Sequence, residues 1–141
     1  MAFNVLIVDD SSSMRSVIKK TLEISGFDIG QIFEGGNGRE ALDVLDKQWA
    51  DVILTDIHMP DMDGFSFLKE LQKDEVLSST RVVVVTTDSR EERIDELMGL
   101  GVKAVIQKPF RPEQIKKILL DVLGIDEQAT EDKDDLDSCD F

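Results

Sequence analysis

The sequence predicts an α/β fold, a doubly wound five-stranded parallel sheet with helices on both faces. Short apolar runs alternate five times with longer segments in which apolar residues recur every three or four positions. Strand–helix alternation of this kind predicts parallel strands, because each connection crosses over a face of the sheet. The 141 residues, 41% of them hydrophobic, are enough for one domain with a sizeable core.

Each expected strand is short and is followed by a helical segment. The strands are expected at Val5–Val8, Ile29–Phe33, Val52–Thr55, Arg81–Thr86 and Val102–Gln107. The helices are expected from Ser11–Ser13 to about Ile24, from Asn37 or Gly38 towards Trp49, from Gly64 to Lys73, from about Ser89 to the residues before Gly99, and from Pro112 to about Leu123. The residues expected to face the core include Val17, Trp49, Phe65, Ile94 and Met98.

The composition of the strands predicts their order in the sheet. The first, third and fourth are apolar throughout, which is typical of strands buried on both faces. The second is interrupted by Gly30 and Gln31, and the fifth alternates apolar and polar residues, so both are expected at the edges. The order 2-1-3-4-5, that of a flavodoxin-like sheet, meets these conditions and places the first and third strands side by side.

Charged residues follow three of the strands. Asp9 and Asp10 end the first and Asp56 ends the third, while Lys108 follows the fifth. Three neighbouring carboxylates repel one another unless a cation balances them, and an oxygen-only cluster favours Mg²⁺. With the ammonium of Lys108 and a hydroxyl from Thr86 at the end of the fourth strand, the set fits phosphoryl transfer in which one carboxylate attacks.

The net charge of −14 excludes some classes of partner. A chain this acidic is expected to be repelled by nucleic acid and by anionic membrane surfaces. No apolar run is long enough to span a bilayer, and the N-terminus has no signal-peptide pattern, so a cytoplasmic protein is expected. The single cysteine, Cys139, excludes an intramolecular disulfide. Residues 126–141 carry half of the net charge, and we expect residues 125–141 to be a flexible acidic tail after a domain of residues 1–124.

Four separated motifs carry a resemblance to a known family. The segments VLIVDDSSSMR, ADVILTDIHMPDMDGFSFLKEL, VVVVTTDS and QKPF occur in one frame with consistent spacing. Residues 3–124 resemble the receiver domain of two-component response regulators, and DDSSSMR is similar to stand-alone receivers of the chemotaxis type.

The resemblance implies a role for each motif residue. Asp56 would accept a phosphoryl group from a sensor histidine kinase. Mg²⁺ (or Mn²⁺) would be held by Asp9, Asp10, Asp56 and the backbone carbonyl of His58. Lys108 would bind the phosphoryl group, Thr86 would turn towards it as the switch with Thr87 beside it, and the Lys108–Pro109 peptide would be cis.

The sequence departs from the family pattern near the switch. The position often occupied by an aromatic residue is Val105, so an aromatic readout on the face formed by the fourth helix, fifth strand and fifth helix cannot operate. Thr87 is bulkier than the usual small residue, while His58 and Asp88 stand where the family tunes dephosphorylation. The expected output is contact with a protein target such as a flagellar motor switch, or with a phosphatase, and the expected catalysis is limited to the protein's own phosphorylation and dephosphorylation.

Other functions fit the sequence less well. A Mg²⁺-dependent phosphatase with an aspartyl nucleophile needs a second acid two residues later, where this chain has His58. A nucleotide-binding domain needs glycines in the first strand–helix turn, where this chain has acids and serines. A phosphate sink stays open, and so does a pseudo-receiver that only binds a partner, although the complete set of acids with Lys108 and Thr86 argues against the latter.

Overall fold

The structure, a computed structural model, describes residues 2–125 and has the predicted architecture. Five parallel strands form one sheet in the order β2-β1-β3-β4-β5. The strands are β1 (Phe3–Val8), β2 (Ile29–Gly35), β3 (Val52–Thr55), β4 (Arg81–Thr86) and β5 (Ala104–Gln107). The helices are α1 (Ser12–Ser25), α2 (Gly38–Leu45), α3 (Gly64–Lys73), α4 (Glu91–Gly99) and α5 (Pro112–Leu123), with a short 3-10 helix at Leu77–Ser79. The expected acidic tail and Cys139 lie outside the described residues.

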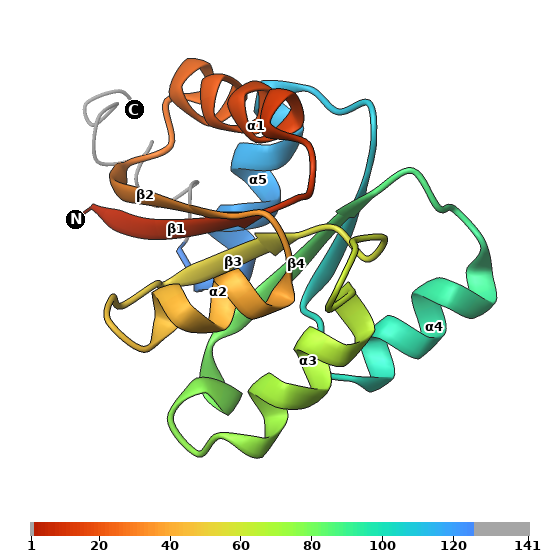
Figure 1. Ribbon diagram of the computed structural model, residues 1–141. Coiled ribbons are helices and arrows are strands. Elements are labelled where there is room, and N and C mark those ends of the chain that lie inside the picture. Colours follow the sequence, from red (N-terminus) through yellow and green to blue (C-terminus); the bar gives the residue numbers. More distant parts are fainter. Residues whose placement is uncertain (1, 126–141) are drawn as a thin grey trace, which may run out of the picture.

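Helices cover both faces of the sheet (Figure 1). On one face, α1 and α5 pack on β1, β3 and β4 through residues such as Ile18, Leu22, Ile115 and Leu119. On the other face, α2 and α3 cover the same strands through Ala41, Leu45, Phe67 and Leu68, and α4 joins them through Leu97. β1, β3 and β4 therefore lie between two apolar layers, as their sequences predicted.

Polar residues begin the first three helices by capping them. The side chains of Ser11, Asn37 and Asp63 accept hydrogen bonds from backbone N–H groups in the first turns of α1, α2 and α3. α1 ends at Gly26, whose φ of 80° lies in the left-handed region that glycine adopts without strain. β1 ends at Val8 and the N-cap of α1 is Ser11, so Asp9 and Asp10 lie in the short turn between β1 and α1.

Several residues expected to face the core do not. α2 ends at Leu45, so Trp49 lies beyond it and is 57% exposed. On α1, Val17 is exposed, and on α4 only Leu97 is buried while Met98 is exposed and Ile94 is half-buried. On α3 the buried aromatic residue is Phe67, and Phe65 is only half-buried. The apolar spacing predicted these helices but not which of two neighbouring apolar residues faces the sheet. β5 also begins at Ala104 rather than Val102.

None of the helices in residues 2–125 is both long enough and apolar enough to cross a membrane.

Candidate functional site

Three carboxylates meet at the carboxyl ends of β1 and β3. Val8 and Thr55 pair at the ends of these strands, and the N–H of Asp56 donates to the carbonyl of Val8 over 2.9 Å. Asp9, Asp10 and Asp56 each offer a carboxylate oxygen within 4.8 Å of the others. Asp9 is 2% exposed, whereas Asp10 is exposed and Asp56 is half-buried. The adjacency of β1 and β3 thus creates the cluster.

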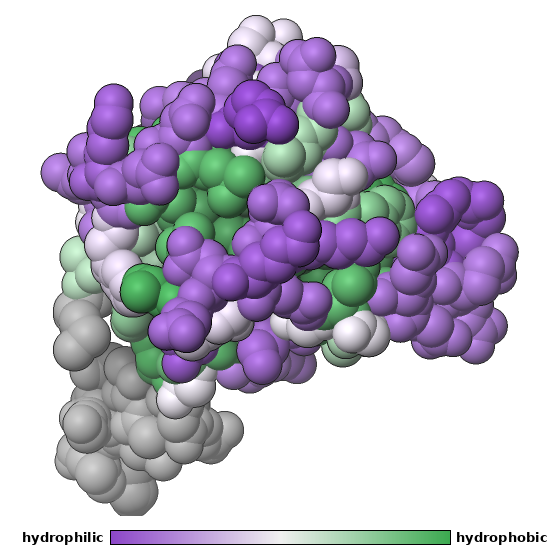
Figure 2. All heavy atoms as spheres, turned by 60° about the horizontal axis from the view of Figure 1, so that its bottom comes forward, coloured by the Kyte–Doolittle hydropathy of each residue, from purple (hydrophilic) through white to green (hydrophobic). Residues whose placement is uncertain are grey.

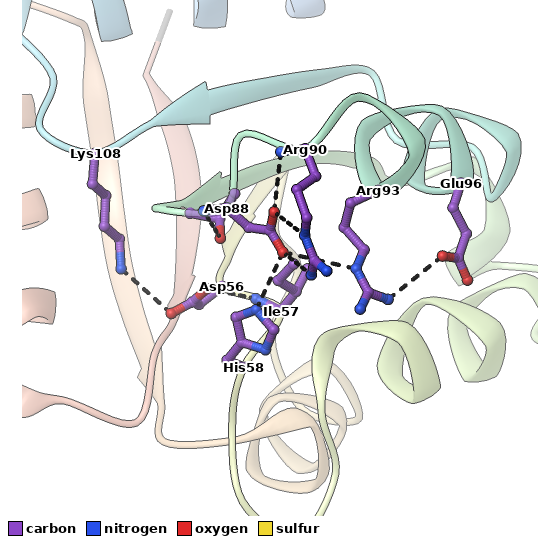
Figure 3. Close-up of polar contacts among 9 residues, drawn as sticks. Asp56, Ile57, His58, Asp88, Arg90, Arg93, Glu96 and Lys108 are labelled. Carbon is purple, nitrogen blue, oxygen red and sulfur yellow. Dashed lines mark hydrogen bonds and ion pairs between the residues drawn. The ribbon is translucent and has the colours of Figure 1, made fainter.

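Lys108 brings a positive charge to the same place from the end of β5. Its N–H donates to the carbonyl of Thr86 over 2.9 Å, which ties the residue to the end of β4. Its ammonium lies 3.0 Å from Oδ2 of Asp9 and 3.4 Å from Oδ2 of Asp56, and its side chain is 12% exposed. Figure 3 shows Lys108 extended towards Asp56. The peptide bond from Lys108 to Pro109 is cis.

The loop after β3 holds the Asp56 side chain in one orientation. Oδ1 of Asp56 accepts a hydrogen bond of 2.7 Å from the N–H of Ile57, which leaves Oδ2 for Lys108. At the start of α3, the N–H of Gly64 donates to the carbonyl of Ile57 over 3.0 Å. A Cβ on Gly64 would lie 2.6 Å from the carbonyl oxygen of Asp56, so only glycine allows this approach.

Asp9 is fixed by the start of α1. Its Oδ1 accepts a hydrogen bond of 2.9 Å from the N–H of Ser11, and its backbone carbonyl accepts one from the guanidinium of Arg15. Arg15 is held in turn by Glu34, with Nε 2.9 Å from Oε1. These contacts leave Oδ2 of Asp9 facing Lys108.

The charges in this cluster fit a divalent cation. Three carboxylates and one ammonium leave a surplus of two negative charges in a partly buried site. All the side-chain ligand atoms on offer are oxygens, the type that Mg²⁺ and Mn²⁺ prefer. Asp9, Asp10 and Asp56 are therefore chemically suited to hold such an ion, whose charge would balance the surplus. His58 follows in the same loop with an exposed side chain, and a metal contact through its carbonyl stays a prediction.

The predicted switch residues lie at the ends of β4 and β5. Thr86 is 1% exposed, and its Oγ1 accepts a hydrogen bond of 3.2 Å from the N–H of Asp88. Thr87 is exposed and lines a mostly apolar hollow together with Met14, Lys108 and other residues of α1 and the loop after β5. Val105 is half-buried against the core on the α3 side.

Beside the acidic cluster, Asp88 gathers two arginines and a histidine, a group that sequence reasoning missed. Its carboxylate binds Arg90 closely, with Nη2 2.6 Å from Oδ2, and lies 3.7 Å from Nε of Arg93 and 3.6 Å from Nε2 of His58 (Figure 3). Hydrogen bonds from Arg90 are the main reason why the pKa of Asp88 lies well below its usual range. The sequence signal was the pair Arg90 and Arg93, three residues apart at the start of an expected helix.

The chain is similar to proteins of bacterial chemotaxis along most of its length. A family model described as the response regulator receiver domain matches residues 5–120. A chemotaxis protein CheY homolog of Campylobacter jejuni is 37% identical over 121 residues, which cover 85% of this chain and 92% of that protein. Chemotaxis protein CheY-3 of Vibrio cholerae is 38% identical over 115 residues, which cover 82% of this chain and 87% of that protein.

A solved structure has the same fold. The chemotaxis response regulator CheY4 of Vibrio cholerae matches with a TM-score of 0.76 at 34% identity, and the match covers 86% of this chain and 99% of that one. The sequence identity of 34% is high enough for the likeness to reflect common ancestry as well as shared architecture. The sequence motifs, the sheet order and these matches agree, and the chain belongs to the response regulator receiver domain family of two-component signalling proteins.

Proposed function

We propose that this chain is a phosphorylation switch of a chemotaxis-type two-component system, with Asp56 as the phosphoacceptor. A sensor histidine kinase would donate the phosphoryl group, and a protein target such as a flagellar motor switch, or a phosphatase, would recognise the phosphorylated form. Residues 1–124 would form the receiver and residues 125–141 a separate acidic segment. The relatives named above support this role, because they are chemotaxis proteins that the chain matches over 87% or more of their own length.

The observation that carries the proposal is the arrangement of Asp56 and Lys108. The Oδ2 atom of Asp56 lies 3.4 Å from the ammonium of Lys108, while Oδ1 is held by the N–H of Ile57. A carboxylate in this setting has one oxygen facing a fixed positive charge. That charge would attract the phosphoryl oxygens of an incoming donor to the atom that attacks.

The proposed reaction transfers a phosphoryl group from one nucleophile, the histidine of the kinase, to another, the carboxylate of Asp56. An oxygen of Asp56 forms a new bond to phosphorus as the phosphorus–nitrogen bond of the phosphohistidine breaks, and the leaving imidazole takes up a proton. Lys108 stabilises the negative charge on the phosphoryl oxygens, and Thr86 turns its hydroxyl towards them afterwards. Asp9, Asp10 and Asp56 would hold the Mg²⁺ ion, which when bound supplies further neutralisation of these oxygens. His58 and Asp88 would tune the reverse reaction with water.

Intact-mass spectrometry after incubation of the protein with phosphoramidate and Mg²⁺ would test the proposal. The wild type is expected to gain the mass of one phosphoryl group, and the gain should be lost when EDTA removes the metal ion. Asp56→Asn should gain nothing, because the amide is not a nucleophile of comparable strength.

The matched control is Asp63→Asn, which keeps an acceptor for its cap contact with Ser66 and removes a carboxylate from the loop that also carries Asp56. It should be phosphorylated like the wild type. A wild type that binds Mg²⁺ but gains no mass would favour a pseudo-receiver instead. An adduct that no partner distinguishes from the free protein would favour a phosphate sink.

A further inference from the structure

The start of α4 is held by Asp88 rather than by a cap of its own. Arg90 occupies the N-cap position and makes no side-chain cap hydrogen bond. Instead, Oδ1 of Asp88 accepts a hydrogen bond of 3.1 Å from the N–H of Arg90, two residues later, which is an Asx turn leading into the helix. The same carboxylate binds the guanidinium of Arg90, with Nε 3.0 Å from Oδ1.

Asp88 also links α4 to the loop that carries the phosphoacceptor. Its Oδ2 faces Arg93, one turn into α4, and His58, two residues after Asp56. The guanidinium of Arg93 stacks on the ring of Phe65 at 5.1 Å and reaches Glu96 at 3.6 Å. In Figure 3, His58, Arg90 and Arg93 lie around the carboxylate of Asp88, whose side chain is only 9% exposed.

Few other contacts hold α4 against the domain, so the ion pairs and hydrogen bonds of Asp88 matter to its position. Leu97 is the one residue of α4 that is fully buried, and Met98 is 48% exposed. Figure 1 shows α4 at the periphery of the domain. Helices with little buried apolar surface open at low free-energy cost, so α4, which has fewer buried residues than the other four α-helices, is open to control by a few polar contacts.

The backbone of Asp88 depends on the switch residue. Its N–H donates to Oγ1 of Thr86 over 3.2 Å, and Thr86 is 1% exposed. If the Thr86 hydroxyl turns to a phosphoryl group on Asp56, the N–H of Asp88 loses this acceptor in a partly buried setting, which favours movement of the residue. Any movement of Asp88 alters its contacts with Arg90, Arg93 and His58 together.

We propose that Asp88 is the positioning residue that transmits phosphorylation of Asp56 to α4, through Thr86 on one side and Arg90 and Arg93 on the other. The inference rests on the proposed function and deepens it. β5 carries no aromatic residue, and the half-buried Val105 has no ring to rotate, so this network of ion pairs takes the place of an aromatic readout. The phosphorylated form then presents a loosened α4 with Arg90 and Arg93 released from Asp88.

Hydrogen–deuterium exchange of residues 91–97 tests the inference, with and without Mg²⁺ and beryllium fluoride as a stand-in for the phosphoryl group. In the wild type the additive should speed exchange. In Asp88→Asn, which keeps an oxygen for the N–H of Arg90 but loses the charge, exchange without additive should be roughly fivefold faster than in the wild type, and the additive should change it little. In Arg93→Gln, exchange without additive should also be faster than in the wild type, and the additive should again change it little.

The control is Lys73→Gln, which removes an ion pair that is more exposed and lies away from α4, to Glu70 on α3, and which should respond to the additive like the wild type. An increase of equal size in Asp88→Asn and the wild type would overturn the inference, and so would a wild type that gains a phosphoryl group from phosphoramidate but shows no change in α4. A wild type that gains no phosphoryl group would overturn the proposed function instead.

Discussion

Asp10 is the most exposed of the three clustered carboxylates, and its charge has a cost when no cation is bound. It lies with Asp9 and Asp56 in a group whose oxygens come within 4.8 Å of one another, while the one ammonium close by contacts only Asp9 and Asp56. Like charges at this distance destabilise the folded state. A site built to bind a cation therefore lowers stability in the cation's absence.

We expect Asp10→Asn to raise the stability of the metal-free protein by about 1 kcal/mol, since one of three repelling charges is removed. The same substitution should abolish most of the rise in unfolding midpoint that Mg²⁺ causes in the wild type, because a ligand that binds only the folded state stabilises it by mass action. Thermal unfolding in EDTA and in a Mg²⁺ series measures both effects.

Asp43→Asn on α2 is the control for loss of one negative charge on the surface. A metal-free Asp10→Asn protein that is less stable than the wild type would contradict this account of the cluster.

The sequence predicted this cluster because its residues follow strands directly. A carboxylate after a buried strand has its place set by the strand, so strand order was enough to bring Asp9, Asp10 and Asp56 together. The contacts of Asp88 are different in kind. They depend on where a loop of several residues turns and on the rotamers of Arg90 and Arg93, and neither follows from spacing along the chain.

At the scale of elements, the start of α3 is packed directly against the backbone that carries Asp56. Gly64 is the first residue of α3, and a Cβ there would lie 2.6 Å from both the carbonyl oxygen of Asp56 and Cα of Ile57. Backbone atoms cannot move aside as the end of a side chain can. The helix and the phosphoacceptor loop must therefore shift together if a larger residue replaces Gly64.

Gly64→Ala is expected to destabilise the protein by about 2 kcal/mol, the usual range for overpacking a well-packed site. It should also slow the gain of the phosphoryl adduct, since the shift displaces Asp56 relative to Lys108. Chemical denaturation and intact-mass kinetics measure the two effects.

Gly99→Ala at the end of α4 is the matched control. No atom lies within 4 Å of the added Cβ, so we expect no loss of stability and a gain of up to about 0.5 kcal/mol from helix propensity. Equal effects of the two alanines would show that the close approach at Gly64 does not matter.

The ends of α1 and α3 were easier to predict than the faces of the helices. Caps and glycines fix the ends of α1 and α3 locally, which is why Gly64–Lys73 agreed with the structure. Which side of a helix meets the sheet depends on tertiary packing. Phe67 rather than Phe65 became the buried ring, and Trp49 lies outside a helix that stops four residues earlier.

At the scale of the whole molecule, negative charge dominates the surface. The chain has 30 acidic and 16 basic residues and a net charge of −14. On the face brought forward in Figure 2, hydrophilic side chains surround and separate patches of apolar surface. Residues 2–125 carry half of this net charge, and folding holds their charges closer together than the unfolded chain does, so self-repulsion opposes the compact state.

Salt should therefore stabilise this protein. The Debye length falls from about 30 Å at 0.01 M to about 8 Å at 0.15 M salt, which screens repulsion across the domain. The weak exposed ion pairs, such as Lys73 with Glu70, lose less than the net repulsion does. We expect the unfolding midpoint in EDTA to rise by roughly 3 °C over this range of NaCl, equivalent to about 1 kcal/mol.

Tetramethylammonium chloride separates screening from cation binding, because its cation is too large to lie between the oxygens of Asp9, Asp10 and Asp56. An equal rise in both salts is the expected result of screening over the whole surface. A rise only in NaCl would place the effect at the acidic cluster, where Asp10→Asn should then remove it. A midpoint that falls with either salt would mean that local ion pairs, such as those around Asp88, stabilise the fold more than the net charge destabilises it.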